Sequence, residues 1–553
     1  MEQTKVRELQ DVVIRFSGDS GDGMQLTGTL FSDTSALLGN GISTFPDYPA
    51  EIRAPQGTVA GVSGFQVHFG NHRELNPGDY CDVLVAMNPA ALKANRKWLK
   101  PGATVILDGD SLTEEHLKKA GFATLDPLEE LKLDEYNVVV PDITSMTREA
   151  LKETGLDNKA IVKCKNMFAL GICFWLFDRP EDYALKYLDG KFAKKNPAVA
   201  EANKLAIAAG YNYAANTHQF ANNYTVAPAP REKGTYRSIN GNVATAWGLC
   251  AAAEKAGLPL FCGSYPITPA TVILEELAKR KDLGVKTVQA EDEIAGICTA
   301  IGAAFAGNFA VTTTSGPGLS LKSEALGLAV MTELPLVVVD VQRGGPSTGL
   351  PTKTEQSDLA QALYGRNGEC PVIVVAASSP SDCFHYAFEA GRLAMEHMTP
   401  VILLTDGFIA NGSEPWRIPE MKDYPAIQPP IVDKAPEGGF MPYVRNEKLA
   451  RGWAFPGKVG LEHRVGGLEK DCVKGCISHD PANHQKMTRT RAEKVAKVAE
   501  DIPAQSVYGD AEGDLLVVGW GGTRGHLQNA VDEMRKEGKK VSLCHFNYIN
   551  PLP

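Results

Sequence analysis

The sequence of 553 residues lacks the long apolar runs that a membrane protein needs. No stretch approaches the roughly 18 consecutive apolar residues of a membrane-spanning helix, and the longest apolar runs, at 335–341 and 400–404, are predicted to be buried strands. The first residues also lack the apolar stretch and small-residue cleavage site of a secretory signal peptide. We therefore expect a cytoplasmic protein that does not associate with a membrane.

The sequence also has fewer basic than acidic residues. The sequence has 56 Lys and Arg residues against 66 Asp and Glu residues, which gives a net charge of −10. An acidic surface repels a phosphate backbone, so this balance argues against a nucleic-acid-binding protein. Apolar residues make up 44% and charged residues 22%, as is usual for globular proteins, and the length suggests three or four domains.

Clustered cysteines are absent. The eleven cysteines are an odd number and lie scattered along the chain, mostly within apolar patterns, which favours free thiols in a reducing compartment over a disulfide framework. No C-x-x-C-x-x-C cluster occurs, so we expect no four-cysteine iron–sulfur centre in this chain.

One alternative for the cysteines stays open. Cys472, Cys476, His479 and His484 place four potential zinc ligands within thirteen residues. The C-x₃-C spacing is less usual than C-x₂-C, and Asp480-Pro481 is expected to break the helix that a zinc finger would use. We expect no metal site in this chain, and elemental analysis for zinc would test that expectation.

The chain alternates strands and helices, which predicts an α/β fold built from several doubly wound, parallel-sheet domains. A first domain, 1–211, has predicted strands at 11–16, 81–86 and 104–107 and a helix after the glycine-rich turn 18–23. An Asn-, Thr- and Pro-rich linker is predicted at 212–237.

A second series of strands and helices fills 238–420 and predicts a complete parallel-sheet domain. The stretch 421–500 has little periodic signal and is expected to be an irregular connection. A single strand–helix–strand unit occupies 501–553. Because one such unit cannot cover both faces of its sheet, it must borrow strands or be truncated, and we expect truncation.

Four polar motifs in the second domain follow predicted strands, at 263–269, 290–296, 312–318 and 342–352. Because open parallel sheets bind ligands at the carboxyl ends of their strands, these motifs are expected to meet at one site. Thr268 alone could simply cap the next helix, and three acidic residues at 291–293 could simply complement a helix dipole. An arginine in a rigid Gly–Pro loop, Arg343, is suited to clamp a carboxylate.

The motifs resemble those of the 2-oxoacid:ferredoxin oxidoreductases, which use thiamine diphosphate. They are YPITP at 265–269, EDE at 291–293, TSGPG at 314–318, GPSTGLPT at 345–352 and EQSDL at 355–359. The first domain resembles the gamma domain of this family, including KNM at 165–167 and ALG at 169–171. A gamma-like domain fused ahead of an alpha-like domain is most similar to the alpha subunits of 2-oxoglutarate enzymes.

The resemblance implies a thiamine-diphosphate pyrimidine-side domain at 238–420 and a transketolase C-terminal-like domain at 501–553. It implies that Glu293 is catalytic and hydrogen-bonds N1′ of the aminopyrimidine, and that Tyr265 and Pro266 bind the cofactor. It further implies that Thr268 and Arg343 bind the substrate. The reaction would convert 2-oxoglutarate, coenzyme A and oxidised ferredoxin into succinyl-CoA, CO₂ and reduced ferredoxin, with reductive carboxylation as the reverse.

The glycine turn 18–23 does not fit a cofactor motif. Its G-x-x-G-x-G spacing differs from the G-x-G-x-x-G of dinucleotide sites and from the family's more common G-x-G-G-x-G form. Gly21-Asp22-Gly23 resembles the start of the thiamine-diphosphate metal motif, but the window from Phe45 to Arg53 lacks its Asn pair.

By resemblance, a partner beta subunit then supplies the Mg²⁺–diphosphate site and a 4Fe-4S cluster, the assembly is a dimer of heterodimers, and this chain alone is inactive. Two alternatives remain, namely the same chemistry on pyruvate or another 2-oxoacid, and a non-catalytic regulatory or assembly subunit.

Overall fold

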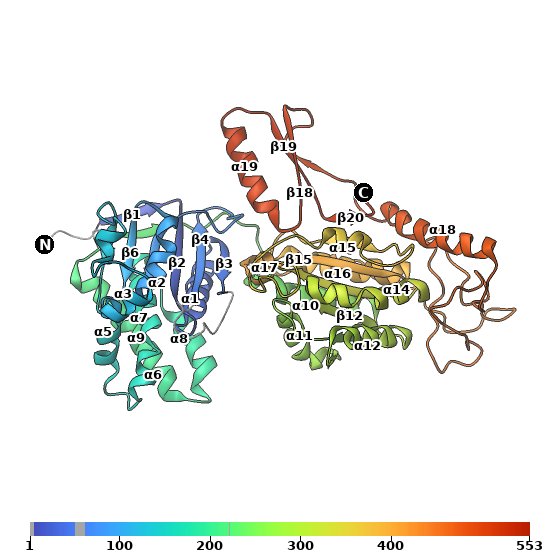
Figure 1. The fold of residues 1–553 in the computed structure, drawn as a ribbon, viewed down its shortest axis with the longest axis horizontal. Helices are drawn as coiled ribbons and strands as arrows, with labels where there is room; N and C mark the ends of the chain where they lie inside the picture. The colour runs from blue at the N-terminus through green and yellow to red at the C-terminus, as the bar shows by residue number, and fades with distance from the viewer. Residues whose placement is uncertain (1–4, 50–60, 221) are drawn as a thin grey trace. The chain divides into compact units, whose positions relative to one another are not determined.

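The computed structural model describes residues 5–49, 61–220 and 222–553 (Figure 1). The chain forms two compact units. The first comprises the described residues up to Ser238 together with Ser413–Ile418, and the second comprises Ile239–Gly412 and Pro419–Pro553. Within the described ranges, no helix is both long and apolar enough to cross a bilayer.

The first unit is built on a six-stranded sheet with the order β3-β4-β2-β5-β6-β7. Its strands are β2 (Asp11–Asp19), β3 (Gly41–Asp47), β4 (Val62–Gly70), β5 (Cys81–Ala86), β6 (Leu99–Leu107) and β7 (Asn137–Val139). The strands predicted at 11–16, 81–86 and 104–107 are confirmed. The strand β4, which was not predicted, runs antiparallel to both β2 and β3, so the sheet is mixed rather than purely parallel.

The helices of the first unit surround this sheet (Figure 1). They are α1 (Met24–Leu37), α2 (Pro89–Asn95), α3 (Glu114–Lys119), α4 (Pro127–Glu130), α5 (Ile143–Leu151), α6 (Asn158–Val162), α7 (Lys165–Leu176), α8 (Asp182–Leu188) and α9 (Pro197–Thr217). Two glycines let α7 and α9 touch, because a Cβ on Gly171 would lie 2.0 Å from the Ile207 carbonyl oxygen and one on Gly210 would lie 1.9 Å from that of Phe168. The predicted linker 212–237 contains the end of α9 and β8 (Asn222–Val226), which pairs in parallel with β1 (Lys5–Leu9).

The second unit contains a seven-stranded sheet with the order β11-β10-β12-β13-β15-β14-β20. Its strands are β10 (Leu260–Ser264), β11 (Lys286–Gln289), β12 (Phe309–Thr314), β13 (Leu336–Gln342), β14 (Ile373–Ala376), β15 (Pro400–Asp406) and β20 (Tyr548–Asn550). All neighbouring pairs are parallel except β14 with β20. The valine-rich β13 is buried along its whole length, as a strand covered on both faces must be.

Helices cover the strands of this sheet on both sides. They are α10 (Gly241–Ala256), α11 (Thr271–Ala278), α12 (Glu293–Phe305), α13 (Gly316–Leu321), α14 (Ser323–Thr332), α15 (Leu359–Tyr364), α16 (Asp382–His397) and α17 (Gly407–Asn411). The helices α12 and α14 bury apolar side chains against Val338 and Ile402, while α10 and α16 pack closely against each other. A short two-stranded sheet pairs β9 (Tyr236–Asn240) with β16 (Ser413–Arg417), and β16 and most of β9 belong to the first unit.

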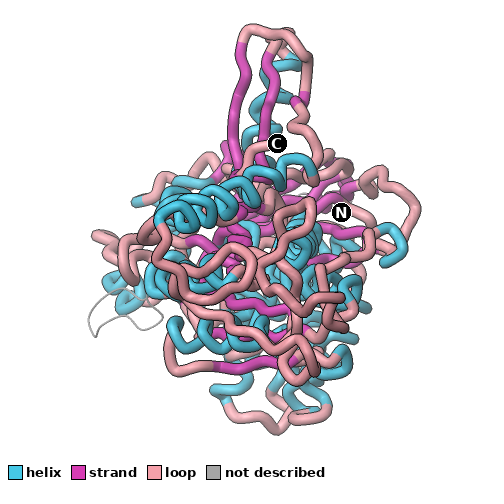
Figure 2. Tube along the Cα trace, turned by 90° about the vertical axis from the view of Figure 1, so that its right-hand side faces the viewer, coloured by secondary structure: helices cyan, strands magenta, loops and turns pink. Residues whose placement is uncertain are grey.

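The chain between Pro419 and Asp480 is mostly loop, as Figure 2 shows, and leads into the long helix α18 (Pro481–Lys497). As predicted, no helix runs through Asp480-Pro481, because the helix begins at this dipeptide. The Asp480 side chain accepts hydrogen bonds from the backbone N–H groups of Ala482 and Asn483, and Pro481 occupies the first helical position, where it loses no hydrogen bond.

A buried ionic cluster attaches this stretch to the sheet domain. The carboxylate of Glu333, at the end of α14, forms ion pairs with Arg445 and with Lys494 on α18, and all three side chains are almost fully buried. Burial opposes ionisation of Glu333, but the Lys494 ammonium and the Arg445 guanidinium lower its pKa to about 2. This carboxylate therefore links both the loop and α18 to the sheet domain.

Replacing Glu333 with glutamine should lower the free energy of unfolding by about 3–5 kcal/mol, because it leaves two buried cations without their anion. Urea denaturation would measure the loss, with Glu437→Gln, an exposed acid in the same stretch, as the control. Because the folded-state pKa lies below the ordinary 4.5, the contribution is present above about pH 4.5 and is lost as the pH falls towards 2. An unfolding midpoint no lower than that of the control would contradict this role.

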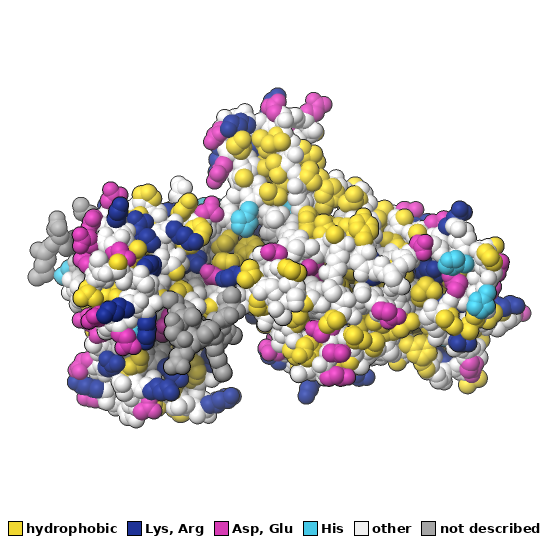
Figure 3. All heavy atoms as spheres, viewed as in Figure 1, with side chains coloured by type: hydrophobic (Ala, Val, Ile, Leu, Met, Phe, Trp, Pro, Cys, Tyr) yellow, Lys and Arg dark blue, Asp and Glu magenta, His cyan; other side chains and the backbone are white. Residues whose placement is uncertain are grey.

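The last part of the chain forms a three-stranded sheet, β17-β19-β18, with the helix α19 (Arg524–Lys536). The strands are β17 (Val507–Tyr508), β18 (Leu515–Trp520) and β19 (Val541–Phe546). Hydrophobic side chains gather on its surface (Figure 3), and Leu515, Leu516 and Val518 of β18 are each more than half exposed. Gln356 Nε2 donates to the Trp520 carbonyl at 3.2 Å, which ties the end of β18 to the loop after Arg343.

Candidate active site

The carboxyl ends of four parallel strands, β10, β12, β13 and β15, lie next to one another in the second unit. Each strand ends in a polar residue, and these are Ser264, Thr314, Gln342 and Asp406. Ser264 Oγ bonds to the Thr313 carbonyl oxygen at 2.7 Å, which joins the first two strand ends. The loops that carry the four sequence motifs leave the sheet at this edge, as the spacing predicted.

The three acidic residues at 291–293 have separate roles. Asp292 caps α12, because its side chain accepts a hydrogen bond from the Ala295 backbone N–H at 2.7 Å. Glu293 is the first residue of the helix and is 9% exposed, whereas Glu291 is exposed. The helix-dipole explanation therefore accounts for Asp292, and Glu293 is the carboxylate that the fold places in the interior.

Gly318, in the first turn of α13, makes room for Glu293. A Cβ on Gly318 would lie 2.1 Å from Thr314 Oγ1 and 2.8 Å from Glu293 Cγ, both far inside van der Waals contact. The absence of a side chain at 318 thus lets the Glu293 side chain lie directly over the start of α13.

We expect Gly318→Ala to displace the Glu293 side chain and to lower activity about 10- to 100-fold. Moving a catalytic group by about 1 Å can cost about 100-fold in rate. The matched control is Gly327→Ala in α14, where the only atom near a new Cβ is Cys370 Sγ at 4.0 Å. That control should keep full activity and gain about 0.4–1 kcal/mol of stability. Steady-state rates and thermal unfolding of the two variants would test the contrast, and equal activities would contradict it.

Arg343 and Thr268 meet across the site. Arg343 Nη1 donates to the Thr268 carbonyl oxygen at 2.7 Å, and Arg343 is 7% exposed. Burial lowers the pKa of the Arg343 guanidinium, while the carboxylates of Asp358 and Glu293 oppose that shift. A buried guanidinium facing two carboxylates remains a cation, and its Nε has no hydrogen-bond partner among the described residues.

Thr268 does not cap the following helix, which was the alternative to a role in binding. The helix α11 begins at Thr271, its cap residue is Ala270, and no side chain caps it. Thr268 instead lies in the loop with its side chain exposed and its carbonyl bonded to Arg343. The hydroxyl is therefore available to a ligand rather than committed to a helix end.

Tyr265 and Pro266 follow directly after β10. Tyr265 is 37% exposed and Pro266 is half-buried. Both lie on the loop that also carries Thr268, so all of the residues selected from the sequence lie on the loops or helix ends at one edge of the sheet.

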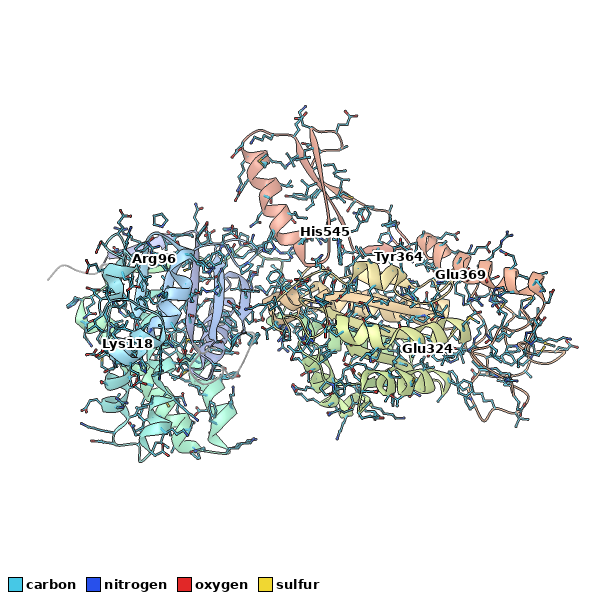
Figure 4. All side chains as sticks on the ribbon, viewed as in Figure 1. Arg96, Lys118, Glu324, Tyr364, Glu369 and His545 are labelled. Carbon is cyan, nitrogen blue, oxygen red and sulfur yellow. The ribbon has the colours of Figure 1, made fainter. Side chains whose placement is uncertain are left out.

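A buried lysine was not foreseen. Lys322 lies between α13 and α14, two residues before Glu324, which is labelled in Figure 4, and its side chain is fully buried. Lys322 Nζ donates to the Glu293 backbone carbonyl at 2.7 Å. Burial lowers the pKa of Lys322 to about 8, with the Glu293 carboxylate opposing the shift. No sequence pattern indicated that Lys322 is buried, because lysine side chains usually lie at the protein surface.

The glycine turn 18–23 lies in the first unit, where its own Asp22 and two residues of α7 form bonds with it. Asp22 Oδ2 accepts from the Asp19 backbone N–H at 2.9 Å, and Asp22 also pairs with Lys165 at 3.2 Å. Asn166 Nδ2 bonds to the Gly23 carbonyl at 3.3 Å. The residues Lys165 and Asn166 therefore support this turn. The window from Phe45 to Arg53 extends beyond the described residues.

In the parts of the chain that the structure describes, no three His, Cys, Asp or Glu side chains come together as metal ligands. The residues of the zinc alternative have other environments. His484 Nδ1 pairs with Glu469 at 2.7 Å, and Cys476 is exposed. No disulfide bond joins the cysteines of the described residues.

Two family profiles match the chain. The profile described as "Pyruvate flavodoxin/ferredoxin oxidoreductase, thiamine diP-bdg" matches residues 252–477, and "Pyruvate ferredoxin/flavodoxin oxidoreductase" matches residues 13–213. The chain is also 53% identical over 549 residues to the 2-oxoglutarate oxidoreductase subunit KorA of Mycobacterium tuberculosis, covering 99% of this chain and 83% of that protein.

Other relatives extend this result. A 2-oxoglutarate synthase subunit KorA of Methanothermobacter marburgensis is 35% identical over 57% of this chain and 82% of its own length. A solved structure, the 2-oxoglutarate:ferredoxin oxidoreductase from Magnetococcus marinus with 2-oxoglutarate, coenzyme A and succinyl-CoA bound, matches with a TM-score of 0.84 and 33% identity. That match covers 99% of this chain and 89% of the other. The family predicted from the motifs is confirmed, and the chain belongs to the 2-oxoacid:ferredoxin oxidoreductases as a member of their alpha-subunit family.

Proposed function

We propose that this chain is the alpha subunit of a 2-oxoglutarate:ferredoxin oxidoreductase. The enzyme oxidatively decarboxylates 2-oxoglutarate, transfers the succinyl group to coenzyme A and passes two electrons to ferredoxin. The observation that carries this proposal is the convergence of buried Glu293 with Arg343 and Thr268 at one edge of the sheet. The relatives named for 2-oxoglutarate favour this substrate over pyruvate and other 2-oxoacids. The intact set of residues speaks against a non-catalytic subunit.

The residues fit the aminopyrimidine side of thiamine diphosphate. A carboxylate in a largely buried place over Gly318 is the group that can exchange a proton with a ring nitrogen. Tyr265 and Pro266, beside it on the loop after β10, offer an aromatic and an apolar surface for the ring. When bound, thiamine diphosphate supplies the carbon nucleophile that adds to the 2-oxo carbon and the electron sink for decarboxylation.

The residues of this chain divide the remaining work. Glu293 holds the proton that moves to and from N1′ of the aminopyrimidine. Lys322 keeps the first turn of α12, and thus Glu293, in place through its bond to the Glu293 carbonyl. Arg343 binds the 1-carboxylate of the substrate by charge-assisted hydrogen bonds, and the free hydroxyl of Thr268 faces the carbonyl region. The low exposure of Glu293 and Arg343 excludes water, which strengthens these interactions.

A second chain completes the site in this proposal. The partner supplies the Mg²⁺–diphosphate half and a 4Fe-4S cluster, as the resemblance to the two-subunit enzymes implies. Apolar side chains around the site are exposed, namely Tyr265, Val272, Ile294 and Leu350. Such a ring of exposed apolar groups is typical of a protein–protein interface.

The experiment that tests this function is a 2-oxoacid panel with the co-purified subunits, thiamine diphosphate, coenzyme A and ferredoxin. We expect kcat/KM for 2-oxoglutarate to exceed that for pyruvate, because Arg343 binds the 1-carboxylate that both substrates share and only 2-oxoglutarate has a second carboxylate for further contacts. The second carboxylate of 2-oxoglutarate then adds discrimination of at least about 10-fold. Preference for pyruvate would shift the proposal to the alternative substrate, and no turnover of any 2-oxoacid would contradict it.

A further inference from the structure

The first unit contains a cavity that the proposed function does not use. Its volume is about 390 Å³, within the range of about 300–1,000 Å³ that is usual for small-molecule sites. The loop after α7 and the start of α8 form one part of its wall, and the last third of α9 forms the rest. The helices α8 and α9 pack against each other (Figure 1), so one rigid part of the fold carries the whole wall.

A buried arginine without an anionic partner lines this cavity. Arg179 is 4% exposed, and its guanidinium lies over the ring of Phe69, with Cζ 5.0 Å from the ring centroid. Its backbone N–H donates to the Phe174 carbonyl at 2.8 Å, which fixes the residue at the end of α7. Among the described residues, the guanidinium forms no ion pair, and its Nε and Nη2 have no hydrogen-bond partner.

This arginine differs from other buried cations of the chain. Arg15 pairs with Asp47, and Arg445 and Lys494 share Glu333. Burial lowers the pKa of Arg179 to about 10, which still leaves the guanidinium charged at neutral pH. Because burial removes water from a cation, and the ring of Phe69 offsets only part of that cost, a negatively charged group in the cavity is strongly favoured.

The other residues of the wall suit an organic ligand rather than an inorganic ion. Pro180, Leu185 and Ala208 present apolar surface to the cavity. Tyr211 and Asn212, on α9, bring a hydroxyl and an amide to the same wall. A mostly apolar wall with a few polar groups is the usual composition of a small-molecule site.

Two acidic residues limit the charge of the ligand. Glu181 and Asp182 also line the cavity, and they follow Arg179 closely along the chain. Burial, and then the Asp182 carboxylate, raises the pKa of Glu181. These two carboxylates repel a polyanion such as a nucleotide, whereas a ligand with one negative group can pair with Arg179 and keep its uncharged part towards the apolar residues.

We propose that this cavity binds a small organic acid with a single carboxylate and an apolar body, and that the carboxylate pairs with the Arg179 guanidinium. The planar guanidinium can donate two parallel hydrogen bonds to a carboxylate. The apolar body then lies against Pro180, Leu185 and Ala208. This site is additional to the proposed function, because neither Glu293 nor Arg343 belongs to it.

Isothermal titration calorimetry of the full chain tests the site with 3-phenylpropionate and hexanoate as probes. We expect saturable binding of one acid per chain. The matched alcohol 3-phenylpropan-1-ol, which has no charge, should bind at least about 10-fold more weakly than 3-phenylpropionate, the loss expected for a hydrogen bond to a charged group. Absence of binding by both acids, or equal affinity for the acid and the alcohol, would overturn the proposal.

Variants of Arg179 locate the binding. Arg179→Met should weaken binding of 3-phenylpropionate about 10-fold or more, and Arg179→Lys should weaken it less, because the ammonium keeps the charge but not the two parallel bonds. The control is Lys186→Met, which removes an exposed positive charge from α8 and should leave the affinity unchanged. Equal binding by the unmodified chain and Arg179→Met would overturn the site. If Arg179→Met does not fold, Arg179→Lys and the comparison of acid with alcohol decide the question.

The same titration with the complex of this chain and its partner subunit distinguishes the source of the carboxylate. A free acid as the natural ligand predicts the same affinity in the complex as in the chain alone. Loss of binding in the complex would show that an acidic side chain of the partner occupies the cavity, and would overturn the proposal of a small-molecule site.

Discussion

Replacing Glu293 with glutamine should lower kcat of the reconstituted enzyme by at least about 100-fold, the lower range of what a positioned acid–base group contributes. The amide has nearly the same shape but cannot take or give a proton at N1′. Because the Glu293 side chain lies over Gly318 without filling its space, the isosteric change should leave the fold intact. Steady-state ferredoxin reduction with saturating 2-oxoglutarate measures the effect.

Glu291→Gln is the matched control for this experiment. Glu291 lies two residues earlier in the same acidic run but is exposed, so its loss should leave kcat within about a factor of two, as surface substitutions usually do. A large loss in both variants would indicate a general effect of negative charge. Near-normal turnover of Glu293→Gln would remove Glu293 from the proton transfer.

Replacing Arg343 with methionine should lower kcat/KM for 2-oxoglutarate about 100-fold or more, because truncating one partner of a buried, hydrogen-bonded charge pair costs about 2–5 kcal/mol. Most of the loss should appear in KM, since the guanidinium binds the carboxylate in both the ground state and the transition state. Arg343→Lys should recover only part of it, because an ammonium cannot form two parallel hydrogen bonds to a carboxylate.

The control for Arg343 is Arg489→Met, which removes an exposed positive charge from α18. Its kinetic constants should match those of the unmodified enzyme. If Arg343→Met raised KM no more than Arg489→Met does, the substrate carboxylate would have to bind elsewhere in the assembly.

Much of the second unit was predictable because its strands are short apolar runs bounded by polar turns. The apolar runs at 335–341 and 400–404, predicted to be buried strands, are found as β13 and β15. The strand β4 in the first unit was missed. It pairs with β2 in the antiparallel direction, and no local sequence pattern indicates that the chain turns back at this point. Periodicity describes a strand but not the direction of its neighbour.

The site was predictable where a motif ended a strand and unpredictable where two distant segments met. Glu293 and Arg343 were found because each follows directly from a strand or begins a helix. Lys322 was missed because its burial depends on how α13 packs on α12.

The cap alternative for Thr268 failed for a similar reason. A threonine before a proline and a helix has the sequence of a cap, yet the helix starts at Thr271. The Thr268 carbonyl instead accepts a hydrogen bond from Arg343, a contact that the local sequence does not predict.

The most direct test of the account is to measure succinyl-CoA formation from 2-oxoglutarate by this chain alone and by this chain with its partner subunit, each with thiamine diphosphate, Mg²⁺, coenzyme A and ferredoxin. We predict turnover only when both chains are present, because in the proposed function this chain provides the aminopyrimidine side and the carboxylate clamp and its partner provides the metal–diphosphate site. Turnover by this chain alone, or none by the two together, would contradict the account.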